Sequence, residues 1–321
     1  MMTEALTLHQ DLSLTLEERE VAPPQIGEAL IRIEYAGICG SDLHVLKTGD
    51  WVTTWPAVLG HEIIGVVQDC PGNEYAVGDR VVVDSRVPCG DCTGCQRAAN
   101  LCENLAWVGE IVPGGYERHA VFDVALLHLC PPELEPGIGV LAEPQAVAMH
   151  GVNRLSTIPE SVLILGYGPI GALVHAEIRR QQPECEVSVR ELNAERLQLA
   201  RAFGAISDST RTRWPLVVDA AGYATSLADS IELTAHGGSI LAIAIPHASV
   251  SVDAQGLVER SITVVGSVGF CDELPEAIDL LAQEPDNYRA LVTEALLLDE
   301  ASERLGTLTS VPAAGKVVIR L

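Results

Sequence analysis

Four cysteines lie within fourteen residues of this chain and form its clearest chemical signal. They follow the spacing Cys-x2-Cys-x2-Cys-x6-Cys, at Cys89, Cys92, Cys95 and Cys102. Four thiolates this close together satisfy the tetrahedral preference of zinc and leave no coordination position open. The pattern therefore predicts a structural zinc site, in a lobe at residues 86–106 that has few apolar residues and needs its metal to fold.

A second set of possible metal ligands lies nearer the N-terminus. Cys39 begins the stretch Cys39-Gly40-Ser41-Asp42-Leu43-His44, and His61 and Glu62 follow after a short segment. A thiolate and an imidazole bind a borderline-soft metal well, and a carboxylate can serve as the third ligand. Each of these residues alone is more often a buried thiol or a core histidine. Together they predict a catalytic zinc site, because three protein ligands leave the fourth position to water or substrate.

A glycine-rich turn is the third signal. It directly follows the apolar run 162–165 and precedes a stretch with helical spacing, 171–181. In that context the glycines allow a tight turn and a close approach of the backbone to a pyrophosphate at the helix N-terminus. We therefore expect dinucleotide binding by the residues of this turn, Gly166, Gly168, Pro169, Ile170 and Gly171.

The choice between NAD and NADP depends on one acidic residue. Glu191 stands at the end of the next predicted strand, twenty residues beyond Gly171. A carboxylate there can accept two hydrogen bonds from an adenosine ribose and repels a 2′-phosphate. NAD is therefore expected over NADP. The neighbouring Arg190 could bind a phosphate, so NADP stays open as the alternative.

The elements that position these residues fall into two groups. Short alternating or β-branched runs at residues 29–35, 63–68 and 80–84, bounded by turn residues, predict a mostly antiparallel β domain. From residue 161 strands and helices alternate, which predicts a doubly wound parallel sheet. The strands are expected at 162–165, 186–190, 216–219, 239–245 and 261–265, and the helices at 171–181 and 194–203. The tail is expected to contain a helix at 274–281 and a strand at 316–321.

Composition excludes several classes of protein. The chain has 321 residues, which favours two domains, and a formal net charge of −24, which disfavours nucleic acid and anionic membrane surfaces. A small molecule is therefore the expected partner. No apolar run approaches the roughly 20 residues that span a bilayer, and Met1 to Gln10 has no signal-peptide pattern. The odd count of nine cysteines suits a reducing compartment, so a cytoplasmic location is expected.

In this order, the motifs resemble those of the zinc-containing medium-chain dehydrogenase/reductase superfamily, on the side of the sorbitol, threonine and butanediol dehydrogenases. Further motifs that carry the resemblance are Gly78-Asp79-Arg80-Val81, Leu141–His150 and Asp219-Ala220-Ala221-Gly222. The resemblance implies a GroES-like catalytic domain at residues 1–145 and 268–321 and a Rossmann domain at 146–267. The stretch 204–217 lacks most of one βα unit that the family normally has, so this Rossmann domain is expected to be shortened.

The resemblance also implies a role for each residue of the catalytic site. Cys39 and His61 bind the catalytic zinc, and Glu62 is a direct ligand or one step removed. Glu143 corresponds to an acid that approaches the same zinc directly or through water. Asp42 matches an acid that orients the ligand histidine.

Three further residues receive roles from the resemblance alone. Ser41 matches a hydroxyl that contacts the substrate oxygen, and His44 matches the outer end of a proton relay. Arg196 matches a basic residue that adds to binding of the adenosine ribose. The last cysteine spacing of the lobe is one residue shorter than is usual in the family, but all four thiolates are present.

The expected function is hydride transfer between a secondary alcohol or polyol and NAD(P), with two zinc ions per chain. Zinc lowers the pKa of the alcohol, while Ser41 and His44 carry the proton. The alternative is a threonine-type aminoalcohol or hydroxy-acid dehydrogenase. A zinc-ribbon module and an inactive cofactor-binding regulator are less favoured, because neither accounts for all of the motifs. The family and the apolar run 261–265 near the sheet edge imply a homodimer or homotetramer.

Overall fold

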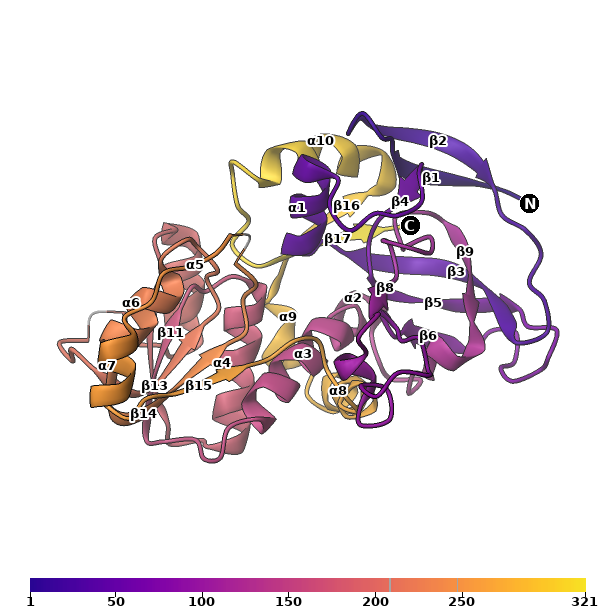
Figure 1. The fold of residues 1–321 in the computed structure, drawn as a ribbon. Coiled ribbons are helices and arrows are strands. Elements are labelled where there is room, and N and C mark those ends of the chain that lie inside the picture. The colour runs from indigo at the N-terminus through magenta and orange to yellow at the C-terminus, as the bar shows by residue number, and fades with distance from the viewer. Residues whose placement is uncertain (208, 247) are drawn as a thin grey trace. The chain divides into compact units, whose positions relative to one another are not determined.

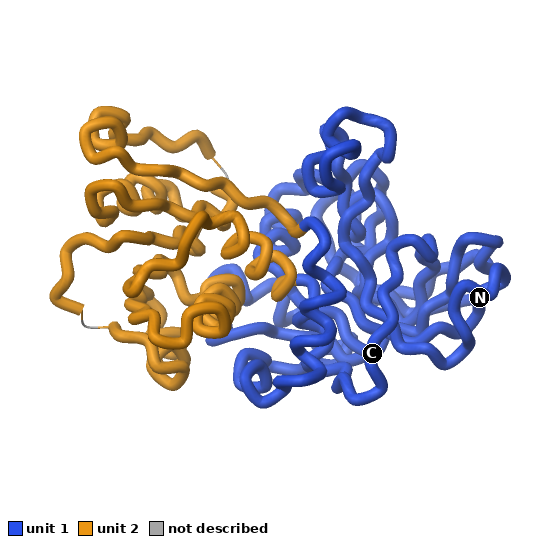
Figure 2. Tube along the Cα trace, turned by 90° about the horizontal axis from the view of Figure 1, so that it is seen from below, with its two compact units in different colours: residues 1–143, 271–321 blue, residues 144–270 orange. Residues whose placement is uncertain are grey.

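The computed structural model describes residues 1–207, 209–246 and 248–321. The chain divides into two compact units, residues 1–143 with 271–321 and residues 144–270, shown in two colours in Figure 2. Both termini belong to unit 1. Each unit contains its own sheets and is described separately. Among the described residues, no helix combines the length and the apolar character needed to cross a membrane.

Unit 1 is built around two sheets whose strands are mostly antiparallel (Figure 1). The smaller sheet has the order β2-β1-β4, with β1 at Met2–Leu8, β2 at Leu14–Glu20 and β4 at Ala57–Val58. The larger sheet has the order β10-β6-β5-β3-β17-β16, and β9 also pairs with β3. Its strands are β3 (Glu28–Gly37), β5 (Glu62–Asp69), β6 (Arg80–Val83), β9 (His119–Asp123), β10 (Leu127–Leu129), β16 (Val292–Leu297) and β17 (Lys316–Arg320). The strands predicted at 29–35, 63–68, 80–84 and 316–321 are confirmed.

The core of unit 1 follows from the alternation along its central strands. Ala29, Ile31 and Ile33 of β3 are buried on one face, where they pack with Val81 and Val83 of β6. Burying one such isoleucine contributes about 1.5–3 kcal/mol relative to leaving it exposed. The helices of the unit are α1 (Gly40–Thr48), α2 (Pro136–Gly139), α8 (Leu274–Gln283), α9 (Asp286–Arg289) and α10 (Leu298–Leu308), with 3-10 turns η1 (Ala99–Leu101) and η2 (Val124–Leu126). The two-stranded ribbon of β7 (Arg86–Val87) and β8 (Ala106–Trp107) flanks the cysteine lobe.

Three adjacent strands of the larger sheet place chemically active residues at one point. β3 ends at Gly37, which is opposite Glu62 at the start of β5. On the other side of β3, Gly37 is opposite Val318, two residues into β17. The chain leaves β3 through Ile38 and enters α1 at Gly40. The sheet register therefore brings the start of α1, the start of β5 and the start of β17 together.

Unit 2 contains a five-stranded parallel sheet with the order β12-β11-β13-β14-β15. Its strands are β11 (Ser161–Leu165), β12 (Glu186–Arg190), β13 (Trp214–Asp219), β14 (Thr234–Ala242) and β15 (Thr263–Gly266). The helices are α4 (Pro169–Gln181), α5 (Ala194–Ala202), α6 (Ser226–Leu233) and α7 (Ala254–Glu259), and α3 (Ala142–Asn153) begins at the unit boundary. The predicted alternation of strand and helix is confirmed. Strand β14 begins earlier than the predicted residue 239 and ends before 245.

Candidate active site

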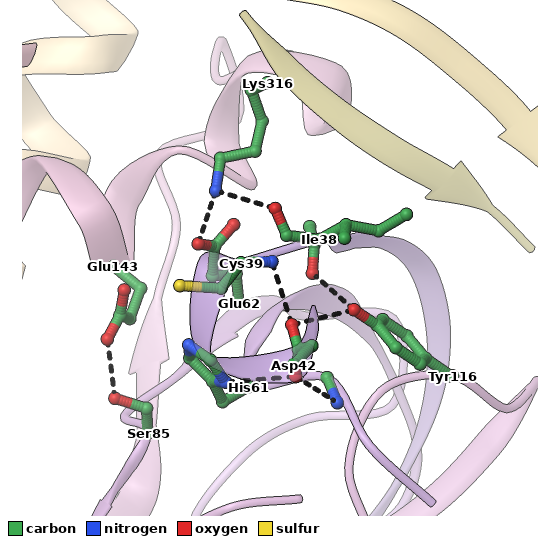
Figure 3. A network of polar contacts seen from close by, with 11 residues as sticks. Ile38, Cys39, Asp42, His61, Glu62, Ser85, Tyr116, Glu143 and Lys316 are labelled. Atoms are coloured by element: carbon green, nitrogen blue, oxygen red, sulfur yellow. Dashed lines mark hydrogen bonds and ion pairs between the residues drawn. The ribbon is translucent and has the colours of Figure 1, made fainter. Parts of the chain in front are cut away.

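Cys39, His61 and Glu62 form a compact group in unit 1 (Figure 3). One ligand atom from each residue lies within 4.8 Å of the others. Cys39 caps α1, and Glu62 is the first residue of β5. Two glycines make room for the group: a Cβ on Gly37 would collide with Oε2 of Glu62, and one on Gly60 would collide with the ring of Tyr116. Gly60 also has a φ of 90°, a conformation that favours glycine.

Asp42 contacts both Cys39 and His61. Its carboxylate accepts a hydrogen bond of 2.8 Å from the backbone N–H of Cys39 and lies 3.6 Å from Nδ1 of His61. Contact through Nδ1 leaves Nε2 of the imidazole for a metal. Burial alone would raise the pKa of Asp42, but His61 and these hydrogen bonds outweigh it and lower that pKa, so the carboxyl stays ionised. Asp42 thus orients both Cys39 and His61.

Tyr116 is a buried partner of Asp42 that the sequence did not reveal. Its hydroxyl lies 2.8 Å from Oδ2 of Asp42 and 3.3 Å from the carbonyl oxygen of Gly37. The side chain is fully buried. A tyrosine in a loop after a Gly-Gly pair has no local pattern that indicates this contact, which joins residues 74 positions apart.

Glu62 shares a buried ion pair with Lys316, the first residue of β17. Nζ of Lys316 lies 2.5 Å from Oε1 of Glu62 and 3.2 Å from the carbonyl oxygen of Ile38 (Figure 3). The other carboxylate oxygen, Oε2, is buried and has no hydrogen-bond partner. A buried carboxylate oxygen without a partner is costly unless a cation satisfies it. A thiol, an imidazole and this carboxylate therefore fit zinc as a donor set.

Glu143 lies outside the compact group. It is in the first turn of α3 and accepts a 2.8 Å hydrogen bond from the hydroxyl of Ser85. Burial raises the pKa of Glu143 to about 7, and the charge of Glu62 adds to the rise. The geometry thus separates the two acids: Glu62 is beside Cys39 and His61, and Glu143 is held by Ser85. Ser85 was not predicted, and a serine after a strand gives no signal of this role.

Ser41 and His44 both lie on α1, one helical turn apart. Nε2 of His44 is 3.0 Å from Oδ2 of Asp50, and its ring packs against Trp51 with the centroids 4.7 Å apart. Asp50 is exposed, so the outer nitrogen of His44 lies beside a group in contact with solvent. Neither Asp50 nor Trp51 was predicted as a partner of His44.

The four cysteines of the lobe also form one compact group. Their sulfur–sulfur distances are 3.8 Å for Cys89–Cys95, 3.5 Å for Cys92–Cys95, 3.9 Å for Cys92–Cys102 and 3.4 Å for Cys89–Cys102. A tetrahedron with zinc–sulfur distances of about 2.3 Å has edges of about 3.8 Å. Backbone N–H groups of Glu103 and Cys95 donate to Sγ of Cys92 and lower its pKa to about 6. The sulfur–sulfur spacing fits a closed zinc site, and the lowered pKa of Cys92 favours its thiolate form.

In unit 2 the glycine-rich turn joins β11 to α4. Gly166 has a φ of 83°, Gly168 caps the helix and Pro169 occupies its first turn. A Cβ on Gly171 would collide with the carbonyl oxygen of Gly166, so the turn depends on a glycine there. The ring of Tyr167 points inward, where its hydroxyl lies 2.9 Å from Nδ1 of the buried His175. The free N–H groups of the first turn fit an anionic pyrophosphate.

A cavity of about 460 Å³ lies at the carboxyl ends of the unit 2 strands, beside this turn. Its lining includes Gly166, Arg190, Glu191 and Tyr223. Glu191 accepts hydrogen bonds from the backbone N–H groups of Tyr167, Leu192 and Asn193, at 2.7–2.8 Å. A carboxylate has about four lone-pair positions, so acceptor capacity remains for a ribose hydroxyl.

Two arginines approach the same part of unit 2 from different elements. The guanidinium of Arg190 lies over the ring of Trp214, 5.5 Å from its centroid. Arg196, on α5, comes close enough to Gly168 that a Cβ there would lie 3.6 Å from its guanidinium nitrogen. The structure thus brings Arg196 to the turn and packs Arg190 on an aromatic ring.

Comparison with known proteins identifies the family. The sequence model of the alcohol dehydrogenase GroES-like domain matches residues 25–132, and that of zinc-binding dehydrogenases matches residues 182–283. A D-altritol 5-dehydrogenase from Agrobacterium fabrum is 31% identical over 94% of this chain and 95% of its own length. The chain belongs to the zinc-containing medium-chain dehydrogenase/reductase superfamily. An L-threonine 3-dehydrogenase from Deinococcus radiodurans is 29% identical over 78% of each chain.

Solved structures of this superfamily share the fold over the full length. A 2R,3R-butanediol dehydrogenase from Bacillus subtilis has a TM-score of 0.89 and 27% identity, with all of both chains covered. A protein from Sinorhizobium meliloti bound to NADP has a TM-score of 0.90 and 26% identity, with the same coverage. The fold class predicted from the motifs, a GroES-like β domain with a parallel-sheet Rossmann domain, is confirmed.

Proposed function

We propose that the protein is a zinc-dependent dehydrogenase that transfers a hydride between a secondary alcohol or polyol and NAD. The observation that carries this proposal is the group of Cys39, His61 and Glu62, with one buried carboxylate oxygen lacking a partner. We propose unit 1 as the catalytic domain and unit 2 as the dinucleotide-binding domain. The aminoalcohol alternative is not favoured, because the 31% identical relative is a polyol dehydrogenase.

The residues of unit 1 divide the chemistry between them. Cys39, His61 and Glu62 would hold the catalytic zinc, which supplies a Lewis acid that lowers the pKa of the substrate hydroxyl. The hydroxyl of Ser41 would accept the proton from the substrate oxygen while it gives up its own proton toward His44. His44, one turn further along α1, passes it toward Asp50 and solvent, since Nε2 of His44 is 3.0 Å from that exposed carboxylate. Glu143 is a buried acid that accepts a hydrogen bond from Ser85, and we assign it no step in the proton transfer.

We propose that the four-cysteine lobe holds a second, structural zinc ion. The lobe has short turns and few buried apolar side chains, so the metal supplies most of its folding energy. Total metal analysis should therefore give about two equivalents of zinc per chain. A single equivalent of zinc per chain would mean that one of the two sites binds no metal. The zinc content of Cys39→Ser would then identify that site.

We propose NAD as the preferred cofactor. Glu191 puts a negative charge beside the expected ribose, and Leu192, which follows it, is fully exposed and offers no donor side chain to a 2′-phosphate. The guanidinium of Arg190 lies over the ring of Trp214, 5.5 Å from its centroid. Glu191→Ser should reduce the ratio of kcat/KM for NAD to that for NADP about tenfold or more, since each hydrogen bond to a charged group is worth about 1.5–3 kcal/mol. A higher kcat/KM for NADP than for NAD in the wild type would contradict this assignment.

The activity is tested by following the absorbance of the reduced cofactor with a panel of secondary alcohols, polyols and L-threonine. We expect turnover of secondary alcohols or polyols. Cys39→Ser should abolish turnover, and Ser41→Ala should lower kcat by about 10²–10⁴-fold, the usual contribution of acid–base catalysis. Exposed Ser13→Ala, on a β1–β2 turn, is the control. Cofactor binding without turnover of any alcohol would instead favour a regulator.

A further inference from the structure

Lys316 is the most deeply buried cation beside the reactive group. Its side chain is 2% exposed, and the carboxyl of Glu62 that it contacts is fully buried. The sequence contains only one other lysine, Lys47, which is exposed on α1. A lysine ammonium is a compact point charge, and burying it is costly unless an anion compensates. Its position therefore requires the charge of Glu62.

The ammonium of Lys316 makes two polar contacts with the protein. Its ammonium donates to Oε1 of Glu62 and to the carbonyl oxygen of Ile38, the residue before Cys39 (Figure 3). The remaining oxygen, Oε2, has no partner. The carboxylate is thus divided: Oε1 is held by a cation of the protein, and Oε2 lies against Gly37, where a Cβ would collide with it.

We propose that Lys316 is a positioning residue that competes with the catalytic zinc for the carboxylate of Glu62. This inference rests on the proposed zinc site and concerns how strongly Glu62 can act as a ligand. A carboxylate shared with an ammonium donates less negative charge to a metal than a free one. Lys316 would therefore keep Glu62 a weak ligand, which would leave the zinc able to accept the substrate oxygen.

Competition and simple structural support make opposite predictions for zinc affinity. If Lys316 only supports the site, removing its charge loosens the site and weakens zinc binding. If Lys316 competes with zinc, removing its charge leaves Glu62 buried without a partner, which destabilises the metal-free protein. Zinc then provides the missing cation, so its affinity rises and its stabilising effect on folding grows.

The test is Lys316→Met, with zinc affinity measured by competition against a chromophoric chelator. Cys39→Ser reports the affinity of the cysteine lobe alone, so the two sites are separated. We expect Lys316→Met to tighten zinc binding at the catalytic site by about tenfold to a hundredfold, equivalent to one charge-assisted hydrogen bond. Thermal unfolding should show a large loss of Tm in the metal-free form and a small loss with zinc. Lys316→Arg and Lys47→Met should stay close to wild type.

Glu62→Gln completes a double-mutant cycle. In the Glu62→Gln background, Lys316→Met should change zinc affinity by less than about threefold, because the shared carboxylate is gone. If Lys316→Met does not fold, Lys316→Gln replaces it, since an amide still donates to both oxygens without a charge. Unchanged or weaker zinc binding in the neutral variants overturns the inference. A wild-type protein that binds zinc only at the lobe overturns the proposed function instead.

Discussion

At the scale of single residues, the proposed catalytic group depends on buried polar contacts with residues outside the motifs. Asp42 orients His61, but Asp42 itself is held by the hydroxyl of Tyr116 and by the backbone N–H groups of Cys39 and Gly60. When a buried carboxylate loses one hydrogen-bond donor, the cost of its desolvation is no longer offset and the folded state is destabilised. Tyr116 therefore supports the geometry of the site through Asp42.

Removing that hydroxyl gives a measurable loss. Tyr116→Phe should lower the free energy of unfolding by about 1.5–3 kcal/mol, the value of a hydrogen bond to a charged group. It should also weaken zinc binding, because Asp42 then holds His61 less firmly. Denaturant unfolding and chelator competition measure the two effects. Tyr75→Phe is the matched control, since that hydroxyl donates to the carbonyl oxygen of Leu127 elsewhere in unit 1. Equal effects of the two variants on zinc affinity would contradict the role of Tyr116.

Glu110 provides a pH-dependent prediction. Burial raises its pKa to about 7, from 4.5 for an ordinary glutamate. Between these values the folded state holds a proton that the unfolded state releases, so the stability from this group is lost as the pH rises through 7. Glu110→Gln removes the titrating carboxyl and with it this pH-dependent loss of stability. The Tm of the variant should therefore decline less steeply between pH 5 and pH 8 than that of the wild type. Calorimetry at several pH values measures it, with exposed Glu18→Gln as the control. Parallel profiles for wild type and Glu110→Gln would show that this carboxyl does not contribute.

At the scale of elements, we expect the cysteine lobe to be held together by a metal rather than by a core. Between β7 and β8 the lobe has one short 3-10 turn, and Cys89 at its start is exposed. Backbone N–H groups donate hydrogen bonds to the sulfurs of Cys92 and Cys102, and those at Cys92 lower the pKa of its thiol. Such an element should respond to metal removal as a unit.

Loss of one thiolate should therefore unfold this lobe selectively. Cys92→Ser should reduce the zinc content from about two equivalents to about one and expose the lobe to proteolysis. Metal analysis and limited proteolysis measure these changes. Cys70→Ser is the control, because Cys70 is buried in the core of unit 1 outside both ligand groups. A full zinc content in Cys92→Ser would mean that this cysteine is not a ligand.

At the scale of the whole molecule, the sheet of unit 2 ends in an exposed strand. β15 pairs with β14 on one side, and Val264 on it is 43% exposed. An apolar strand edge of this kind is stabilised by pairing with a second copy. We expect wild-type particles with a multiple of the 34.2 kDa chain mass.

A charge on this edge should disrupt that assembly. Val264→Lys should shift the mass toward a single chain, because a lysine in a paired edge strand is buried without a partner. Light scattering measures the shift, and Val258→Lys on α7, where the side chain is 79% exposed, is the control. A wild-type mass of 34.2 kDa at micromolar concentration would rule out the oligomer.

Local sequence predicted most of the features whose residues are close together in the chain. The strand–turn–helix at β11 and α4 was predictable because an apolar run, three spaced glycines and a helical pattern follow one another directly. The compact group of four cysteines was predictable because only short spacings separate them in the chain. α10 also had a readable signal, since its buried Leu298, Ala301, Leu305 and Leu308 follow helical spacing, yet it was not predicted.

Tertiary structure alone decided the partners of the reactive residues. Lys316 lies 254 positions from Glu62, Tyr116 lies 74 from Asp42, and Ser85 lies 58 from Glu143. These pairs depend on which strands become neighbours and in which register, and above all on β17 pairing with β3 beside β5. Hydrophobic periodicity shows which face of a strand is buried but carries no information on which distant strand lies next to it. The sequence therefore predicted the candidate ligands, and the sheet register determined the charges and hydrogen bonds around them.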